Sequence, residues 1–371
     1  MTRMLLRAGV VLSLCFSAAQ AGDLDGVLKG ALAGTQTPAV TVLVMKDGKA
    51  IGSGVTGVRR NDAPDPARPD DVWLIGSDAK PMTAALIARL VDRGALSWNT
   101  PLSTLLPELA GGMRPEYRDV TLVQLLSHRA GLPHDDASTD FFMTFFKDTR
   151  PPAAQRLAYL AHALKDAPAG PVGVFNYSNT GFLLAAAAAE HATGLSYEAL
   201  MRREVFAPLG MTSVGFGVTG EGQPQGHHGG KVATLEEANP PMFAPAGNLH
   251  LSMADWAKFC LDQMAGMHGG GKLLRPATYR MMETRLPGAD TGLAWGVQDS
   301  VAGFEGPVLT HAGSDGNWYA LVALFPGTQS GLLIAANAGE DMGGDKAAKA
   351  VFKALIPEVA KPLPATPATS P

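Results

Sequence analysis

Strand-like segments occur at the two ends of the chain, and this feature most limits the folds that the chain can adopt. Near the start, Val40–Met45 and Ala50–Val58 flank Asp47-Gly48, a dipeptide that favours a tight β-hairpin turn. Because the chain between its two ends is mostly helical, we expect both ends to complete one antiparallel sheet. Near the end, four further segments have the composition of strands: Leu293–Val301, Val308–His311, Tyr319–Phe325 and Gly331–Ala336.

The helical middle is expected to form an insertion in that sheet domain. Asp78–Arg93 has apolar residues at helical spacing and ends before Gly94, a natural C-cap. The expected fold class is α/β (α+β), an antiparallel sheet flanked by helices with an inserted all-α domain, and the join is a natural place for a cleft. Residues 22–82 and 287–357 would form the discontinuous α/β domain, residues 83–286 the helical one, and residues 358–371 a disordered tail. The other expected helices are Thr121–His128, Ala153–Leu164, Ser178–Thr193, Tyr197–Val205, Met253–Met264, Pro276–Thr284 and Lys346–Leu355.

The first 21 residues have the pattern of a cleavable signal peptide. Arg3 and Arg7 supply a basic start, residues 8–16 are apolar, and Ala19-Gln20-Ala21 matches an A-x-A cleavage site. The apolar stretch is too short to span a bilayer. We therefore expect cleavage after Ala21, which leaves 350 of the 371 residues, and a periplasmic or secreted protein.

Composition excludes several functional classes. Hydrophobic residues make up 46% of the chain and charged residues 17%, which is too apolar for a disordered protein. A net charge of −4 gives no electrostatic basis for binding nucleic acid, and no later segment is apolar enough to insert stably in a membrane. After loss of Cys15 the chain keeps only Cys260, so we expect no internal disulfide and a buried Cys260.

Motifs for cofactors and metals are weak in this chain. Two matches to G-x-G-x-x-G, at 52–57 and 215–220, do not lie between a strand and a helix, as a dinucleotide site requires. The adjacent His227 and His228 would point to opposite faces of an extended chain, so they are poor partners for one metal ion. The elbow G-x-S-x-G of the α/β-hydrolases is absent. We expect no cofactor and no metal.

Ser77-Asp-Ala-Lys80 is the only S-x-x-K in the sequence, and it begins the strongest expected helix. Residues at i and i+3 share a helix face, so the Lys80 amine could reach the Ser77 hydroxyl and accept its proton. The alternative is an N-cap serine beside a solvated lysine. Pro81 cannot donate a helical hydrogen bond to the Ser77 carbonyl, so either the first turn is distorted or the regular helix starts near Pro81.

Two more polar clusters follow at the ends of expected elements. Tyr177-Ser178-Asn179 precedes a helix, and His311-Ala312-Gly313 with Ser314 ends a strand. A glycine at 313 would allow a substrate backbone to lie close against that strand. Each cluster alone is ambiguous, because a tyrosine beside small polar residues also fits simple helix capping.

Taken in order, the three motifs resemble those of the penicillin-recognising serine hydrolases. That group includes class C β-lactamases, exported D,D-peptidases, D-aminopeptidases and family VIII carboxylesterases, and the related class A pattern is S-x-x-K, S-D-N and K-T-G. The resemblance implies a β-lactamase/transpeptidase-like fold. It covers most of the chain after residue 70: Asp71–Leu106, Leu122–Pro133, Phe175–Met211, Pro245–Phe259 and His311–Pro326.

The sequence departs from the class C pattern at two places that bear on substrate. His311 and Ala312 stand where class C enzymes have Lys and Thr, and His134-Asp135 stands where they place a glutamine that contacts the β-lactam side chain. Both departures count against an efficient β-lactamase. A proline after S-x-x-K, as at Pro81, is familiar among the family VIII esterases.

The resemblance implies an exported serine hydrolase that acts on a small-molecule ester, amide or peptide. Ser77 would be the nucleophile, and Lys80 with Tyr177 would move its proton, with cationic help to Tyr177 from Lys80 or His311. A class C-like β-lactamase, a penicillin-binding sensor with slow turnover and an inactive relative are the alternatives. The remaining expected substrate contacts are Asn179, which would also hold the Lys80 amine, Asp135, His311, Gly313 and the oxyanion-binding N–H groups of Ser77 and Ser314.

Overall fold

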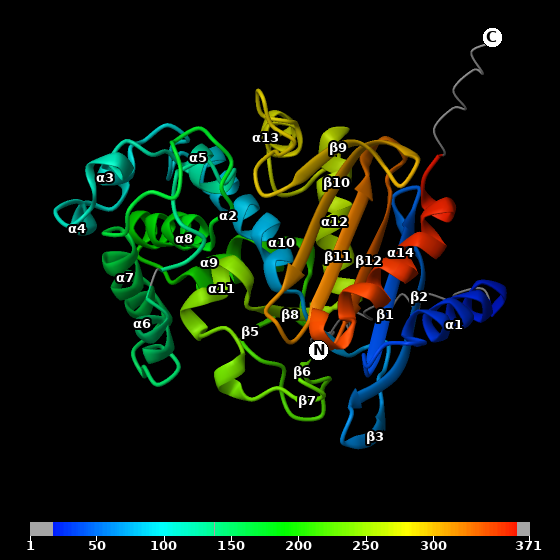
Figure 1. The fold of residues 1–371 in the computed structure, drawn as a ribbon. Coiled ribbons are helices and arrows are strands. Elements are labelled where there is room, and N and C mark those ends of the chain that lie inside the picture. The colour runs from blue at the N-terminus through cyan, green and yellow to red at the C-terminus, as the bar shows by residue number, and fades with distance from the viewer. Residues whose placement is uncertain (1–17, 137, 362–371) are drawn as a thin grey trace, which may run out of the picture.

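A computed structural model describes residues 18–136 and 138–361 of the chain, and its centre is one seven-stranded sheet (Figure 1). The strand order is β3-β2-β1-β12-β11-β10-β9, and every neighbouring pair is antiparallel. β1 pairs with β12 from Val40↔Ala336 to Met45↔Gly331, which joins the two ends of the chain and confirms the expected fold class. The strands are β1 (Ala39–Lys46), β2 (Lys49–Arg60), β3 (Ala63–Pro66), β9 (Gly296–Val301), β10 (Phe304–Ser314), β11 (Tyr319–Phe325) and β12 (Ser330–Ala336).

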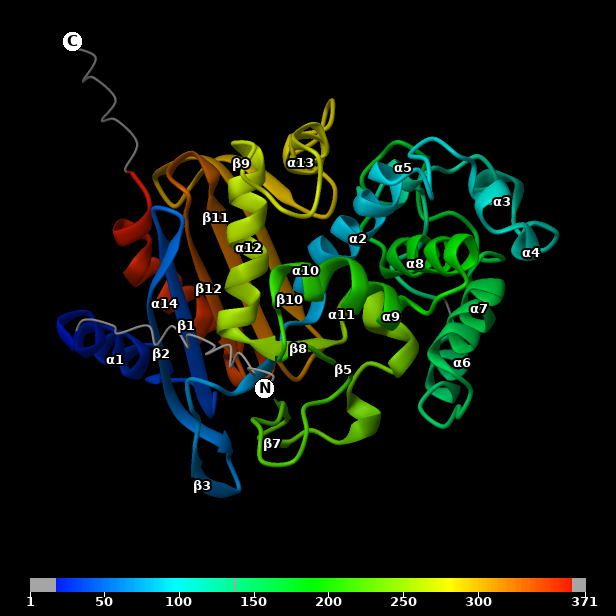
Figure 2. The same cartoon turned by 180° about the vertical axis from the view of Figure 1, so that it is seen from behind.

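Helices cover both faces of this sheet. α1 (Ala18–Leu32) and α14 (Gly344–Val359) lie on one face, and α12 (Met253–Met267) lies on the other (Figures 1 and 2). The alternation of β1 explains this arrangement, because successive side chains of a strand point to opposite faces. Val42 packs in the cluster with α1 and α14, whereas Leu43 belongs to the cluster that contains α12.

The helical part lies beside the far edge of the sheet, next to β10 (Figure 1). Its centre is α8 (Asn179–Thr193), buried from Asn179 to Ala189, which packs against α2 (Lys80–Asp92). One hydrophobic cluster continues from the sheet into these helices. The remaining helices are α3 (Leu102–Leu105), α4 (Pro107–Ala110), α5 (Leu122–Leu126), α6 (Thr139–Thr144), α7 (Pro152–Ala163), α9 (Tyr197–Met201), α10 (Ala207–Leu209), α11 (Ala244–Gly247) and α13 (Pro276–Glu283).

Two small sheets complete the fold. β4 (Val72–Leu74), β8 (Leu249–Ser252) and β5 (Gly215–Phe216) form a three-stranded sheet, and β6 (His227–His228) pairs with β7 (Lys231–Val232). Both G-x-G-x-x-G matches begin in a strand, β2 or β5, and neither opens a helix. Within the described ranges, no helix combines the length and apolarity needed to cross a bilayer. Cys260 is buried and free, as expected.

Several element limits differ from those expected. The predicted helix Tyr197–Val205 divides into α9 and a π-helical turn, Arg202–Phe206. α14 continues to Val359, so the predicted start of a disordered tail at 358 was wrong. The physical reason is that Val359 is buried in the cluster between α14 and the sheet. Residues 362–371, and most of the expected signal peptide, lie outside the described residues.

Candidate active site

Ser77 lies in a 3₁₀ turn, Gly76–Ala79, that connects β4 to α2. Pro81 at the start of α2 has no N–H to donate to the Ser77 carbonyl, so the Lys80 N–H donates to that oxygen instead. Both expected features are present, because the Gly76–Ala79 turn is 3₁₀ and the regular helix α2 starts at Lys80, next to Pro81. The distortion keeps the two side chains together, because the Lys80 Nζ lies 2.9 Å from the Ser77 Oγ.

The Lys80 side chain is completely buried, and burial decides its protonation. Burial lowers the pKa of Lys80 to about 7, although the nearby Asp135 and Asp78 partly oppose that shift. A lysine with this pKa exchanges a proton near neutral pH, as a catalytic base must. The expected hydrogen bond from Lys80 to Asn179 was wrong: the Nζ donates to the carbonyl of Ala246 in α11 at 2.6 Å.

Tyr177 supplies the second contact to the serine. Its hydroxyl donates a hydrogen bond to the Ser77 Oγ at 2.8 Å. Burial raises the pKa of Tyr177 further above its ordinary value, so the phenol is protonated and acts as a donor at rest. The ring stacks on His128, with centroids 4.2 Å apart and planes 23° apart, and the Lys80 Nζ lies 4.9 Å from its centroid.

Asn179 and Asp135 form a polar pair beside these three residues. The Asn179 Nδ2 donates to the two carboxylate oxygens of Asp135 at 3.0 and 3.3 Å. Asn179 is the first residue of α8, whose N-cap is Ser178, so the helix start fixes where its side chain begins. His134 adds a contact of 2.5 Å between its Nδ1 and the Asp135 Oδ2, and this hydrogen bond raises the pKa of His134.

The end of β10 packs directly on the serine turn. A methyl group at position 313 would lie 2.0 Å from the Ile75 carbonyl oxygen and 2.7 Å from the Ser77 nitrogen. Gly76, with φ +51°, has the reciprocal restriction, because a methyl group there would lie 2.5 Å from the Ser314 nitrogen. The missing side chain at Gly313 therefore makes room for the serine turn, and room for a substrate backbone beside it stays a prediction. The same contact makes the N–H groups of Ser77 and Ser314 neighbours, as an oxyanion site requires.

His311 is a neutral residue in this structure. Its Nδ1 lies 2.8 Å from the Ala294 carbonyl oxygen, and because a carbonyl only accepts, Nδ1 carries the proton. Burial and the charge of Lys80 lower the pKa of His311 to about 3. The expected cationic help from His311 was wrong, and its Nε2 is left as an acceptor.

Sequence reasoning missed two residues that surround this group. His128 has φ +58° and is buried under Tyr177, where its Nδ1 accepts from the Ser178 N–H at 3.0 Å. Asp78 follows Ser77, and among the described residues neither of its buried carboxyl oxygens has a hydrogen-bond partner. Burial raises the pKa of Asp78 well above its ordinary value. Asp78 occupies a variable position of S-x-x-K, and His128 lies in a loop that no motif marks. The sequence therefore has no signal that would identify either residue as part of the site.

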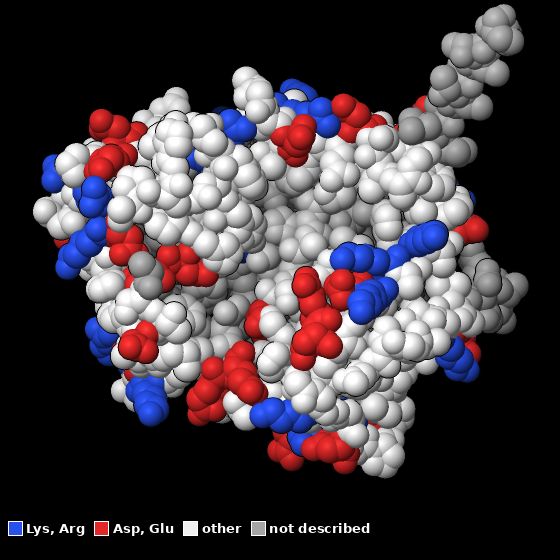
Figure 3. Space-filling view, in the orientation of Figure 1, with Lys and Arg blue, Asp and Glu red and all other residues white. Residues whose placement is uncertain are grey.

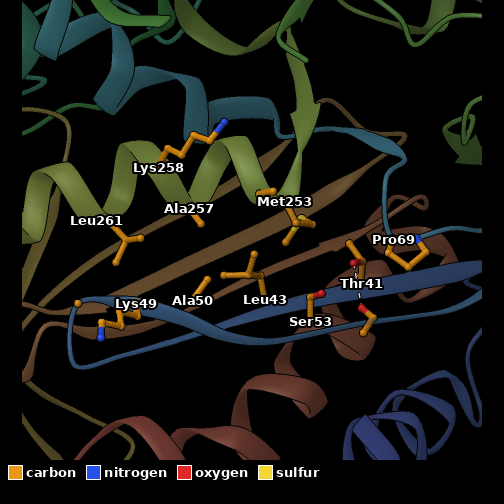
Figure 4. Close-up of a pocket in the computed structure, with 13 residues that line it drawn as sticks. Thr41, Leu43, Lys49, Ala50, Ser53, Pro69, Met253, Ala257, Lys258 and Leu261 are labelled. Carbon is orange, nitrogen blue, oxygen red and sulfur yellow. Dashed lines mark hydrogen bonds between the residues drawn. The ribbon is translucent and has the colours of Figure 1, made fainter. Parts of the chain in front are cut away.

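A cavity of about 460 Å³ lies elsewhere, between α12 and the β1–β2 hairpin (Figure 4). Leu43, Ala257 and Leu261 give it an apolar wall. The Lys258 amine turns away from it and donates to the Gly210 carbonyl and to Asp255. Ser53, Thr41 and Lys49 also line it, and in the described part of the chain no hydrogen bond joins a lysine of this lining to either hydroxyl. No group of three metal-ligating side chains occurs in the described ranges.

Comparisons with known proteins give one family and several relatives. A family model described as Beta-lactamase matches residues 24–356. Penicillin-binding protein 4 of Amycolatopsis lactamdurans is 28% identical over 290 residues, which cover 70% of each chain. The D-alanyl-D-alanine-carboxypeptidase/endopeptidase AmpH of Escherichia coli K12 is 35% identical over 145 residues, but the match covers only 38% of this chain and 36% of that protein.

Two solved structures resemble the fold along nearly the whole chain. A crystal structure of SurE superposes with a TM-score of 0.74 at 24% identity, and it covers 95% of this chain and 80% of the other. The octameric penicillin-binding protein homologue from Pyrococcus abyssi gives a TM-score of 0.73 at 22% identity, with 91% and 77% covered. At these sequence identities the similarity shows a shared fold and nothing about activity.

Proposed function

Because this chain belongs to the β-lactamase family, as its three motifs predicted, we propose that it is an exported serine hydrolase that acts on small esters or amides through an acyl-enzyme on Ser77. One observation carries the proposal: the Ser77 Oγ lies within hydrogen-bond distance of both the Lys80 Nζ and the Tyr177 hydroxyl. A serine hydroxyl reacts only when a neighbour accepts its proton, and a neutral lysine can do so. The substrate type is that of a carboxylesterase or a D-amino-acid peptidase.

Acylation would proceed by proton transfer along these contacts. The Ser77 Oγ attacks the carbonyl carbon as its proton passes to the neutral Lys80 Nζ, and a C–O bond forms. The negative oxygen of the tetrahedral intermediate accepts hydrogen bonds from the N–H groups of Ser77 and Ser314, each worth about 3 kcal/mol in a site of this kind. When the C–O or C–N bond to the leaving group breaks, Lys80 or Tyr177 returns the proton to the departing alcohol or amine.

Deacylation would use the same groups in the reverse direction. A water molecule attacks the acyl carbonyl while the Lys80 and Tyr177 pair takes its proton. The bond from the Ser77 Oγ to the carbonyl carbon then breaks, the acid leaves, and the oxygen regains its proton. The cycle consumes one water for each ester or amide bond and uses no cofactor.

The test is a substrate profile with a nucleophile variant. The purified protein is assayed with p-nitrophenyl butyrate, nitrocefin and a D-Ala-D-Ala peptide, beside Ser77→Ala. We expect hydrolysis of the ester or the peptide and loss of at least about 1000-fold in the variant. Full activity of Ser77→Ala in every assay would show that the nucleophile is another residue. Export is tested separately, by intact mass of the protein from the native host, where we expect a chain that begins at Gly22.

A second candidate is a penicillin-binding protein that is acylated but turns over slowly. The relative named Penicillin-binding protein 4, matched over 70% of this chain, favours it. The neutral His311 and Ala312, in place of a Lys and a Thr, disfavour efficient β-lactam hydrolysis. Intact-mass measurement after incubation with a penicillin separates the two: a persistent adduct on Ser77 together with no esterase activity supports the binding protein.

A further inference from the structure

One side of the site, formed by Asp135 and Asn179, presents a carboxylate and an amide oxygen, and His134 hydrogen-bonds to one oxygen of that carboxylate. Asp135 accepts from the Asn179 Nδ2, and its side chain is 35% exposed. A carboxylate only accepts, so Asn179 has to turn its NH₂ group toward Asp135 and keep its carbonyl oxygen for another donor. The pair therefore offers a carboxylate and an amide oxygen at one place beside the nucleophile, which suits a group rich in N–H donors.

On the other side of the site, His311, Ala312 and Lys80 offer no positive charge that a substrate can reach. His311 is neutral because burial and the charge of Lys80 lower its pKa, and Ala312 has no hydroxyl to donate. Lys80 is completely buried and hydrogen-bonded to Ser77 and Ala246. A substrate carboxylate would therefore meet no partner there and would face Asp135 across the site, which is unfavourable.

The surface around the hollow carries charges of both signs. Figure 3 shows acidic side chains along the lower side of the hollow that separates the helical part from the sheet, with basic side chains beside them. The preference for a charged group therefore depends on the Asp135–Asn179 pair and not on the rim.

We propose that this site selects acyl groups that carry a protonated amine next to the scissile carbonyl, as in amino-acid esters, amino-acid amides and peptides with a free N-terminus. The ammonium would donate to the Asp135 carboxylate and to the Asn179 carbonyl oxygen, while the Ser77 Oγ attacks the adjacent carbonyl. The proposal rests on the proposed function, and it narrows the substrate class of the same site.

The experiment compares three alanine esters in which the amine is free and cationic, acetylated and neutral, or succinylated and anionic. D-Alanine methyl ester, its N-acetyl derivative and its N-succinyl derivative are assayed at pH 7.5, where about half or more of an α-amine is protonated. A charge-assisted hydrogen bond predicts that kcat/KM is about 10- to 100-fold higher for the free amine than for the acetyl form, and lowest for the succinyl form. The L-alanine ester is run in parallel to record any preference for configuration.

Two matched variants identify the carboxylate responsible. Asp135→Asn keeps an oxygen for the Asn179 Nδ2 but removes the charge, so we expect the ratio of kcat/KM for the free amine to kcat/KM for the acetyl ester to fall by about 10-fold or more. Asp140→Asn removes the same charge from an exposed position in the same part of the chain, and we expect it to behave as the wild type.

The outcomes separate this inference from the function on which it rests. Equal rates for the three esters, or an equal loss for all of them in Asp135→Asn, would overturn the preference for an ammonium group. In that case Ser77-dependent hydrolysis of p-nitrophenyl butyrate would still stand as evidence for a serine hydrolase. If none of the alanine esters is hydrolysed, the preference for an ammonium group fails alone as long as Ser77-dependent hydrolysis of p-nitrophenyl butyrate or the D-Ala-D-Ala peptide remains, and both proposals fail if no substrate is hydrolysed.

Discussion

The substitution Lys80→Met should make the protein more stable as well as inactive, and the gain should depend on pH. The Lys80 amine is completely buried, and its pKa falls from an ordinary value of 10.5 to about 7 in the folded protein. The folded state thus holds this proton less tightly than the unfolded state does. The buried charge of Lys80 therefore lowers the free energy of unfolding of the wild type. This loss is complete below pH 7 and disappears as pH rises through 10.5.

The size of this loss follows from the two pKa values. The shift from 10.5 to about 7 corresponds to an upper limit of about 5 kcal/mol at pH 6. At pH 9.5 the same linkage leaves only about 1.4 kcal/mol, so the loss changes by about 3 kcal/mol between these pH values. Methionine also leaves the Ala246 carbonyl without its donor, which costs about 1–3 kcal/mol at either pH. The net gain of Lys80→Met is then about 2–4 kcal/mol at pH 6, and near zero or slightly negative at pH 9.5.

The assay is chemical denaturation of wild type and variant at pH 6 and pH 9.5, followed by tryptophan fluorescence. The difference between the two pH values is the decisive quantity, because the lost hydrogen bond cancels in it. Lys147→Met removes an exposed lysine and serves as the control, for which we expect no pH-dependent difference. If the gain for Lys80→Met is the same at both pH values, the Lys80 amine is not held in its neutral form, and the assignment of Lys80 as a neutral base loses its support.

Two further predictions follow from the geometry of the site. For a neutral ester, kcat/KM should rise with pH through about 7, because Lys80 accepts the serine proton only after losing its own, and a pH–rate profile measures this. A flat profile from pH 5.5 to 8.5 would contradict it. Gly313→Ala should abolish esterase activity and lower Tm, because its methyl group would meet the Ile75 carbonyl oxygen, whereas Gly327→Ala, with nothing within 4 Å, should leave both unchanged.

The sheet could be predicted because its signals are local. The Asp47-Gly48 turn and the strand-forming segments on both sides of it are visible within twenty residues, and the final strands have a similar composition. Pro81 was equally informative, since the loss of one N–H fixes which hydrogen bond the serine turn can make. The composition of Tyr177-Ser178-Asn179 likewise indicated a capped helix start, which the structure places at Asn179.

The contacts between these motifs could not be predicted, because they depend on how distant segments meet. Ala246 binds the Lys80 amine through its backbone carbonyl, and every residue has such a carbonyl, so no sequence pattern marks it. The tautomer of His311 depends on the carbonyl of Ala294, which reaches it from the segment before β9, and its neutrality depends on burial by distant segments. The sequence singled out Gly313, yet its close neighbour in the structure is Ile75 of the same chain, about 240 residues earlier.

The helical part therefore does more than line the site, because it helps to lower the pKa of Lys80. Lys80 would have an ordinary pKa if water reached its amine, and the rings of Tyr177 and Phe182, within 4.9 and 5.6 Å of the Nζ, belong to this part of the chain. The same burial that prepares Lys80 to accept a proton destabilises the protein at acidic pH, so activity and stability oppose each other at this residue. The extensive apolar core shared by the helices and the sheet offsets that cost, which explains how one buried lysine can be kept in a chain whose described part has no disulfide.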